Sequence, residues 1–192
     1  MSHHLKRILE LSSPSIAQEF DPSDLCMTRL LGTERGRELV SLLAQRNGFF
    51  AFESALLVRP INFHGSPLGI VQWNDDALWR HEFDCDFSSV LFFAEDIFGA
   101  QFCFRENKIS SFDPETGDFQ TIAQTLEQWA AWILEDYRVR TGWPLAHEWQ
   151  VAYGQIEAGQ RLLPKRPFVL GGQFSMENLF KLNDVEGMSF RA

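Results

Sequence analysis

Short apolar runs separated by turn residues make the middle of the chain its most clearly patterned part. Runs of this length, bounded by residues that tolerate a positive φ or interrupt a strand, predict antiparallel β-strands joined by tight turns. Asn107 suits a two-residue turn at 106–107, and Pro114 with Gly117 suits a longer turn at 113–118. The pattern therefore predicts a meander over about 88–122, with strands at 88–94, 100–105, 108–112 and 119–122.

Helical spacing of apolar residues occurs on both sides of this meander. It predicts one helix over about 33–46 and a longer one over about 122–138, each with an apolar face. Thr33 suits the N-cap of the earlier helix, and Asn47-Gly48 supplies the left-handed residue that closes it. Weaker patterns predict a short helix at 5–11, a buried strand at 49–58 that is also compatible with a helix, a short helix or irregular piece at 68–83, and a helix at about 145–158.

Together these elements predict an α+β fold, in which an antiparallel or mixed sheet is flanked by helices within a single domain of residues 1–192. The Gly and Pro residues near 141–144 form the one candidate boundary, which we interpret as a hinge between subregions. Phenylalanines crowd the meander and alternate between its two faces, so both faces should be covered by core packing, or one of them should form an aromatic recognition surface. They are Phe92, Phe93, Phe98, Phe102, Phe104, Phe112 and Phe119.

Charge restricts the classes of partner. The chain has 26 acidic and 17 basic residues, for a formal net charge of −9. Phosphate backbones and anionic lipids would repel such a chain, so direct binding to nucleic acid or to a membrane is disfavoured. A basic protein partner would be attracted, although the charge is equally consistent with a role in solubility alone.

Cysteine usage and hydropathy bear on the compartment. Cys26, Cys85 and Cys103 are far apart and odd in number, which does not form a disulfide framework and fits a reducing cytosol. The sequence shows neither a signal-peptide pattern nor an apolar run long enough to span a bilayer. We therefore expect a cytoplasmic protein.

The common catalytic and cofactor motifs are absent from the sequence. No GxxxxGK[ST], GxGxxG or GxSxG pattern occurs. His147-Glu148 begins like a zinc-protease helix, but Val151 stands where the second imidazole is needed. Cys85 follows His81 by four residues, yet the neighbouring Asp84 and Asp86 would raise the pKa of its thiol. We therefore predict no catalytic residue, metal site or cofactor.

Two carboxylate pairs, Asp75-Asp76 and Glu95-Asp96, are the remaining candidates for chemistry. Acid–base hydrolysis needs two carboxylates facing one substrate, and adjacency in the sequence does not establish that arrangement. Acids of turns or of a solvated face are the simplest account, and contact with a protein partner is the next.

The chain resembles the SUKH superfamily, the Smi/Knr-type proteins. Such proteins show an Asn-Gly after an early helix and then an "FAxDxxGxxFxF"-like strand–turn–strand, which corresponds here to FFAEDIFGAQFCF. The matching positions are Asn47, Gly48, Phe93, Ala94, Asp96, Gly99, Phe102 and Phe104. The resemblance covers about 33–138, and the C-terminal extension of about 143–192 lies outside the shared pattern.

The resemblance implies an α+β fold and a non-enzymatic role in protein binding. Bacterial members commonly act as immunity partners of polymorphic toxins, many of them nucleases, and eukaryotic relatives are regulatory interaction proteins. The leading hypothesis is thus an immunity protein that binds a cognate, basic toxin, followed by a regulatory scaffold and by a hydrolase using carboxylates such as Asp76 and Glu95. The contact residues expected from charge and exposed turns are Asp75, Asp76, Glu95, Asp96 and Asp113.

Overall fold

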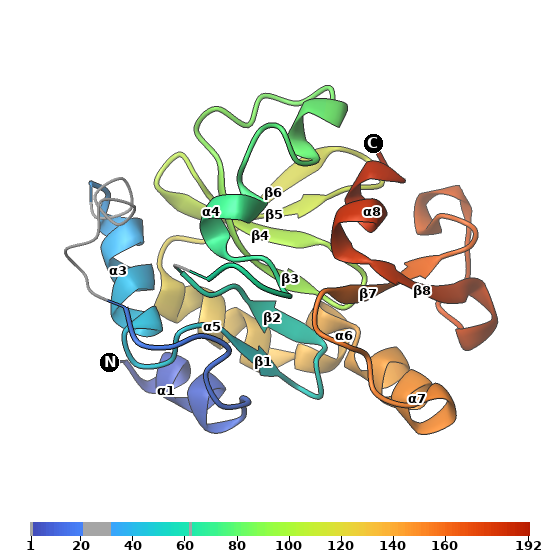
Figure 1. Ribbon diagram of the computed structural model, residues 1–192, viewed down its shortest axis with the longest axis horizontal. Helices are drawn as coiled ribbons and strands as arrows, with labels where there is room; N and C mark the ends of the chain where they lie inside the picture. Colours follow the sequence, from blue (N-terminus) through green and yellow to red (C-terminus); the bar gives the residue numbers. More distant parts are fainter. Residues whose placement is uncertain (1, 21–31, 62) are drawn as a thin grey trace.

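A six-stranded sheet forms the centre of the α+β domain, with helices on one face and an aromatic loop on the other (Figure 1). The computed structural model describes residues 2–20, 32–61 and 63–192, so Cys26 lies outside it. Strand order follows the chain, and every neighbouring pair is antiparallel, which confirms the predicted meander. The strands are β1 (Phe49–Ala51), β2 (Leu56–Val58), β3 (Leu91–Asp96), β4 (Gln101–Arg105), β5 (Lys108–Asp113) and β6 (Asp118–Ala123).

The single strand predicted over 49–58 is wrong, because the chain reverses within it. Phe52, Glu53 and Ser54 all adopt positive φ values of 52°, 53° and 70°, and β1 returns antiparallel as β2. The hairpin at Glu106 and Asn107 behaves as expected, with φ values of 51° and 59° that suit a two-residue turn.

One face of the sheet is covered by helices α1 (His3–Glu10), α3 (Glu34–Leu43), α5 (Leu126–Glu135) and α6 (Tyr137–Thr141). Thr33 caps α3 as predicted, since its side chain accepts a hydrogen bond from the amide of Gly36 at 3.0 Å. The long helix predicted over 122–138 is wrong in extent, because β6 runs to Ala123 and Thr125 caps a helix that starts at Leu126. Asp136, at φ −151°, then separates α5 from α6.

The opposite face is covered by the segment between β2 and β3, which contains α4 (Ile70–Trp73) and the short 3-10 helix η1 (Arg80–Glu82). Strand alternation sends Phe93 and Phe102 to the helical core, and Phe92 and Cys103 to this second core. The second core consists of Trp73, Trp79, Phe87, Val90, Phe92, Cys103, Phe112 and Met188. The expectation that both faces are covered is confirmed, and Cys103 is fully buried in the second core.

The C-terminal extension completes the core and adds a small second sheet. Its helix α7 (Trp143–Tyr153) starts and ends earlier than the predicted 145–158, because Gly142 and Gly154 bound it. The other elements are β7 (Gln160–Pro164), η2 (Phe168–Leu170), η3 (Met176–Asn178), β8 (Leu179–Asn183) and α8 (Asp184–Ser189), with β7 and β8 antiparallel. The amide of Leu162 donates to the carbonyl of Ile97 at 2.9 Å, which joins this unit to the end of β3. None of the described helices is long and apolar enough to cross a bilayer.

Asn47 and Gly48 join β1 to the segment after β2. The Asn47 side-chain carbonyl accepts from the amide of Ile61 at 2.8 Å, and its amide donates to the Ile61 carbonyl at 3.0 Å. Gly48 has φ +73°, and a Cβ there would lie 2.7 Å from Pro60. Both residues are therefore required by packing, independent of any partner.

Gly48→Ala should lower the free energy of unfolding by about 2 kcal/mol or more, because it adds a backbone clash to the cost of a left-handed alanine. Urea denaturation measures this loss. Gly171→Ala is the matched control, since Gly171 has φ +80° but its Cβ would meet Arg166 only at 3.6 Å. The control should lose about 1 kcal/mol, and equal losses would contradict the role assigned to Pro60.

Candidate functional site

Glu95 lies in a buried cluster of charges, so the expectation that it occupies an exposed turn is wrong. Its side chain is fully buried, and its Oε1 atom lies 2.9 Å from Nη2 of Arg59 and 2.7 Å from Nε of Arg161. The same Nη2 of Arg59 lies 2.9 Å from Oδ2 of Asp184. Two arginines and two carboxylates thus balance in charge inside the protein, and we refer to these four residues as the charge cluster.

Polar and aromatic side chains complete the charge cluster. Gln101 donates to Oε2 of Glu95 at 2.8 Å and accepts from the indole N–H of Trp73 at 2.8 Å. The guanidinium of Arg59 lies over the Trp73 ring, 3.4 Å from its centre, and donates to the carbonyl of Leu68 at 3.0 Å. Strands β2, β3 and β4, the α4 segment, β7 and α8 all meet at this point, so the cluster joins the C-terminal extension to the sheet.

The pKa values of the two carboxylates of the charge cluster are shifted in opposite directions. Burial by itself would raise the pKa of Glu95, but the Arg161 and Arg59 guanidinium groups outweigh it and hold that pKa below its usual range. Burial raises the pKa of Asp184, because Arg59 compensates only in part and Glu95 adds like charge. Glu95 therefore stays ionised and serves as the shared acceptor of the cluster.

Asp96 shapes the turn between β3 and β4. Its Oδ1 atom accepts from the amides of Phe98 and Ala100, each at 2.9 Å, while Gly99 takes φ +80°. Burial raises the pKa of Asp96 to about 7, although those two amides favour the ionised form. The side chain is half-buried and engaged by its own turn, so neither acid of the Glu95-Asp96 pair is a freely exposed contact residue.

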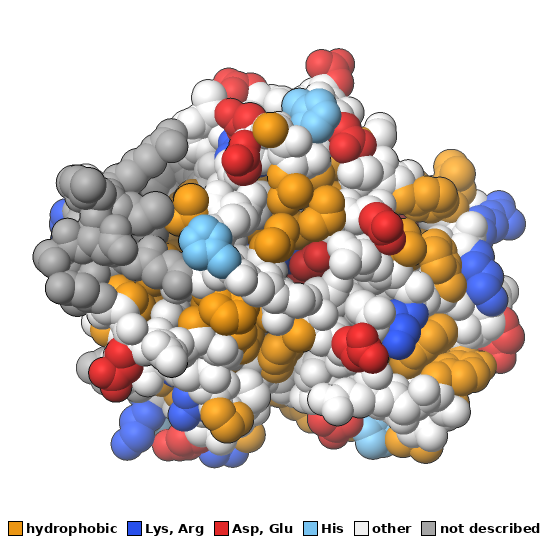
Figure 2. Space-filling view, viewed as in Figure 1, with side chains coloured by type: hydrophobic (Ala, Val, Ile, Leu, Met, Phe, Trp, Pro, Cys, Tyr) orange, Lys and Arg blue, Asp and Glu red, His pale blue; other side chains and the backbone are white. Residues whose placement is uncertain are grey.

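Three of the five expected contact residues, Asp75, Asp76 and Asp113, are exposed. They belong to a larger group of exposed carboxylates on the loop between α4 and β3 and on the turn between β5 and β6. Acidic side chains gather along this upper edge in Figure 2. We name the group the acidic edge, and its members are Asp75, Asp76, Glu82, Asp84, Asp86, Asp113 and Asp118.

The loop and the turn that make up the acidic edge are in contact. The thiol of Cys85 donates to the carbonyl of Gly117 at 3.6 Å. Burial raises the pKa of that thiol, and Asp84 and Asp118 raise it further. Sequence reasoning missed Glu82, Asp84, Asp86 and Asp118 as contact candidates, although the density of acids over 75–86 was the available signal.

Local hydrogen bonds hold the acidic edge in place. Asp75 accepts from the amide of Ala77, and Asp86 accepts from that of Ser88, both at 2.9 Å. Residues 74–90 include one basic side chain of the Lys or Arg type, Arg80, and it is buried. It donates to the carbonyl of Asn74 at 2.7 Å, and its Nε atom lies 3.2 Å from Asp76. The edge therefore presents negative charge from a rigid backbone.

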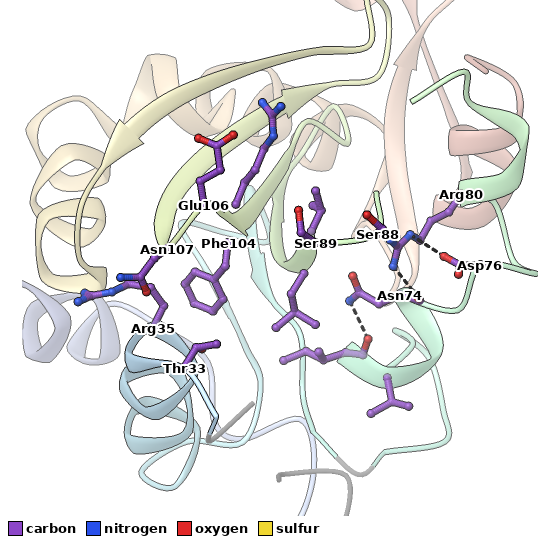
Figure 3. Close-up of a pocket in the computed structure, with 15 residues that line it drawn as sticks. Thr33, Arg35, Asn74, Asp76, Arg80, Ser88, Ser89, Phe104, Glu106 and Asn107 are labelled. Atoms are coloured by element: carbon purple, nitrogen blue, oxygen red, sulfur yellow. Dashed lines mark hydrogen bonds and ion pairs between the residues drawn. The ribbon is translucent and has the colours of Figure 1, made fainter. Parts of the chain in front are cut away.

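A pocket of about 490 Å³ opens beside the acidic edge (Figure 3). The start of α3, the end of α4, the residues before β3 and the tip of the β4–β5 hairpin line it, with Thr33, Arg35, Asn74, Asp76, Arg80, Ser88, Ser89, Phe104, Glu106 and Asn107 among them. The Asn74 side chain accepts from the amide of Phe92 at 2.8 Å and donates to the carbonyl of Phe92 at 2.7 Å. The described lining residues include no His, Cys or Lys, so the pocket offers polar groups of both charges without an imidazole or thiol.

The groups considered for catalysis are not brought together. His81 contacts the carbonyl of Asp76 at 3.0 Å, and Cys85 contacts Gly117, so they do not pair with each other. His147 contacts Glu53 at 2.7 Å. Asp76 has an exposed side chain, whereas Glu95 is enclosed by arginines, so these two carboxylates do not face one substrate. Among the described residues, no group of three or more His, Cys, Asp or Glu is arranged to hold a metal ion.

Comparison with protein-family models gave no match, and comparison with curated proteins gave none either. Among solved structures, the chain is similar to the crystal structure of Atu4351 from Agrobacterium tumefaciens, with a TM-score of 0.61 at 10% sequence identity. The similarity covers 95% of this chain and 86% of that one. At this identity it shows the fold alone, and its coverage means that the fold includes the C-terminal extension.

Glu95→Gln should lower the free energy of unfolding by about 3–5 kcal/mol, because it leaves two buried arginines with only Asp184 as a counter-charge. Urea denaturation measures the effect. Glu186→Gln, an exposed acid of α8, should change stability by less than about 0.5 kcal/mol. Similar losses in both variants would contradict the structural importance of the charge cluster.

Asp96→Asn should change how stability depends on pH. The pKa of Asp96 is raised to about 7 in the folded protein, so between about pH 4 and pH 7 the folded wild type holds a proton that the unfolded chain releases. The contribution of Asp96 to the free energy of unfolding therefore falls as the pH rises through this window. Asparagine keeps the hydrogen-bond acceptor but does not titrate. The free energy of unfolding of the variant should therefore rise relative to that of the wild type as the pH increases across that window.

Unfolding free energies measured from about pH 4 to pH 8 test this expectation. Asp86→Asn is the control: the amide of Ser88 lowers the pKa of Asp86, so the contribution of this carboxylate changes only below about pH 4, and the variant should run parallel to the wild type across the window. Parallel profiles for Asp96→Asn and the wild type would rule out the raised pKa.

Proposed function

We propose that this chain is a non-enzymatic protein-binding module, an immunity protein of the bacterial cytoplasm that neutralises a cognate basic toxin by direct binding. The observation that carries the proposal is the acidic edge, where seven exposed carboxylates lie on backbone held by turns and by the second core. The SUKH resemblance supplies the immunity role, and the fold is compatible with it.

An acidic edge of this kind suits a partner whose own function requires positive charge. A nuclease binds phosphate groups with Lys and Arg side chains, and those side chains attract carboxylates equally well. Binding here would cover the toxin's substrate surface and exclude nucleic acid from it. The net charge of −9 would also accelerate the encounter.

Local hydrogen bonds hold part of the acidic edge ready for a partner. Asp75, Asp86 and Asp113 each accept a hydrogen bond from an amide two residues later, so little ordering is needed when a partner binds. A hydrolase relying on Asp76 and Glu95 lacks support, because the two carboxylates do not share a cleft. A regulatory scaffold for another cytoplasmic protein is the second candidate, since the same edge would serve it, and the identity of the partner distinguishes the two.

Neutralising Asp75, Asp84 and Asp86 together, each to Asn, should weaken binding of the partner by roughly 10- to 1000-fold, mainly through slower association that converges with wild type at high salt. Asn retains the side-chain acceptor that Asp75 and Asp86 use in their turns. The toxin-like protein recovered from native-host lysate, purified and measured by surface plasmon resonance, provides the assay.

The matched control replaces the exposed acids Glu19, Glu148 and Glu157 by Gln, which changes the net charge equally. It should leave affinity nearly unchanged. Equal weakening by both triple variants would show a net-charge effect without a defined surface, and wild-type affinity in the first variant would overturn the role of the acidic edge.

A further inference from the structure

The C-terminal extension exposes large apolar side chains on a single loop. Val169, Leu170 and Phe174 are 56%, 63% and 67% exposed. The rings of Phe98 and Phe168 lie behind them, with ring-centre distances of 3.9 Å between Phe168 and Phe174 and 5.3 Å between Phe98 and Phe168. We refer to Val169, Leu170 and Phe174 as the apolar patch, and such grouped exposure on a stable surface is typical of an interface.

The loop that carries the apolar patch is held rigidly. Asn178 accepts from the amide of Arg166 at 2.9 Å and donates to the carbonyls of Arg166 and Gln173, each at 3.0 Å. The amide of Val169 donates to Glu115 at 2.9 Å, which fastens the loop to the β5–β6 turn. The patch is thus presented in one conformation, and binding there requires little loss of conformational entropy.

Opposite charges flank the apolar patch. Glu115 contacts it on the side of the β5–β6 turn, whereas Lys165 and Arg166 precede it on the loop, and both are exposed. In Figure 2 the C-terminal region shows two basic side chains on the upper part of its outer rim with an acidic one below them, and apolar side chains inside that rim. A strongly acidic or strongly basic partner would match only one of these flanks.

We infer that the apolar patch binds a second copy of this chain, in a two-fold symmetric dimer. Rotation about an axis through the patch places the acidic flank of one copy opposite the basic flank of the other, and joins the two apolar centres. The loop of residues 74–90 lies outside this contact, so each subunit of the dimer keeps most of its acidic edge available to a partner. The inference does not depend on the proposed function.

Sedimentation equilibrium of the full chain over micromolar concentrations tests the dimer. Wild type should fit a monomer–dimer equilibrium, and Leu170→Ser with Phe174→Ser should raise the dissociation constant at least about tenfold. Val139→Ser, equally apolar and 76% exposed but located on α6, should leave it unchanged. A wild type that stays monomeric, a larger open assembly, or a dimer that survives the double substitution would overturn the inference.

A cross-linking measurement tests the position of the symmetry axis. Gln173→Cys should form an intermolecular disulfide under mild oxidation, because residue 173 is exposed beside the apolar patch and its two copies approach each other near the axis, while Leu170 and Phe174 are kept. Val139→Cys should not form one. Equal cross-linking at both positions, or none at residue 173, would contradict a two-fold contact at the apolar patch.

Discussion

The charge cluster of Arg59, Glu95, Arg161 and Asp184 is the interaction on which the arrangement of the molecule depends. Arg59 directly follows β2, and Glu95, Arg161 and Asp184 belong to β3, β7 and α8; the two arginines share one carboxylate oxygen of Glu95. Removing any one charge would leave a buried excess of the other sign, which costs far more than a lost surface ion pair. The cluster therefore makes the C-terminal extension part of the domain, in agreement with a structural similarity to Atu4351 that covers 95% of the chain.

Two surfaces follow from this arrangement. The second core, with Trp79 at its centre, supports the loop of the acidic edge from beneath, while the charge cluster holds the C-terminal extension that carries the apolar patch. Both surfaces are held by hydrogen bonds to the backbone. The residues that match the SUKH pattern, such as Gly48 and Phe102, support the fold from the core.

Local chemistry explains which parts of the fold and site were predictable from sequence. The β4–β5 hairpin was predictable, because Asn107 readily adopts the positive φ that its turn needs. The cap at Thr33 was predictable as well. The reversal after β1 was not predictable, since Phe52, Glu53 and Ser54 adopt left-handed conformations without a glycine to indicate them.

Glu95 was misplaced because its partners Arg59, Arg161 and Asp184 are remote in sequence and only the tertiary fold brings them together. Asp75, Asp76 and Asp113 were correctly expected to be exposed, because backbone turns that start at Asp75 and at Asp113 keep these acids at the surface.

Native-state hydrogen exchange tests most directly whether the charge cluster makes one rigid body of the sheet and the C-terminal extension. The informative amides are those of β4, at the centre of the sheet, and that of Leu162 in β7, which donates to the carbonyl of Ile97. One rigid body requires that both amides exchange only through global unfolding, with the same free energy and the same dependence on denaturant. A distinctly lower free energy at Leu162 would show that β7, β8 and α8 open by themselves, and would contradict it.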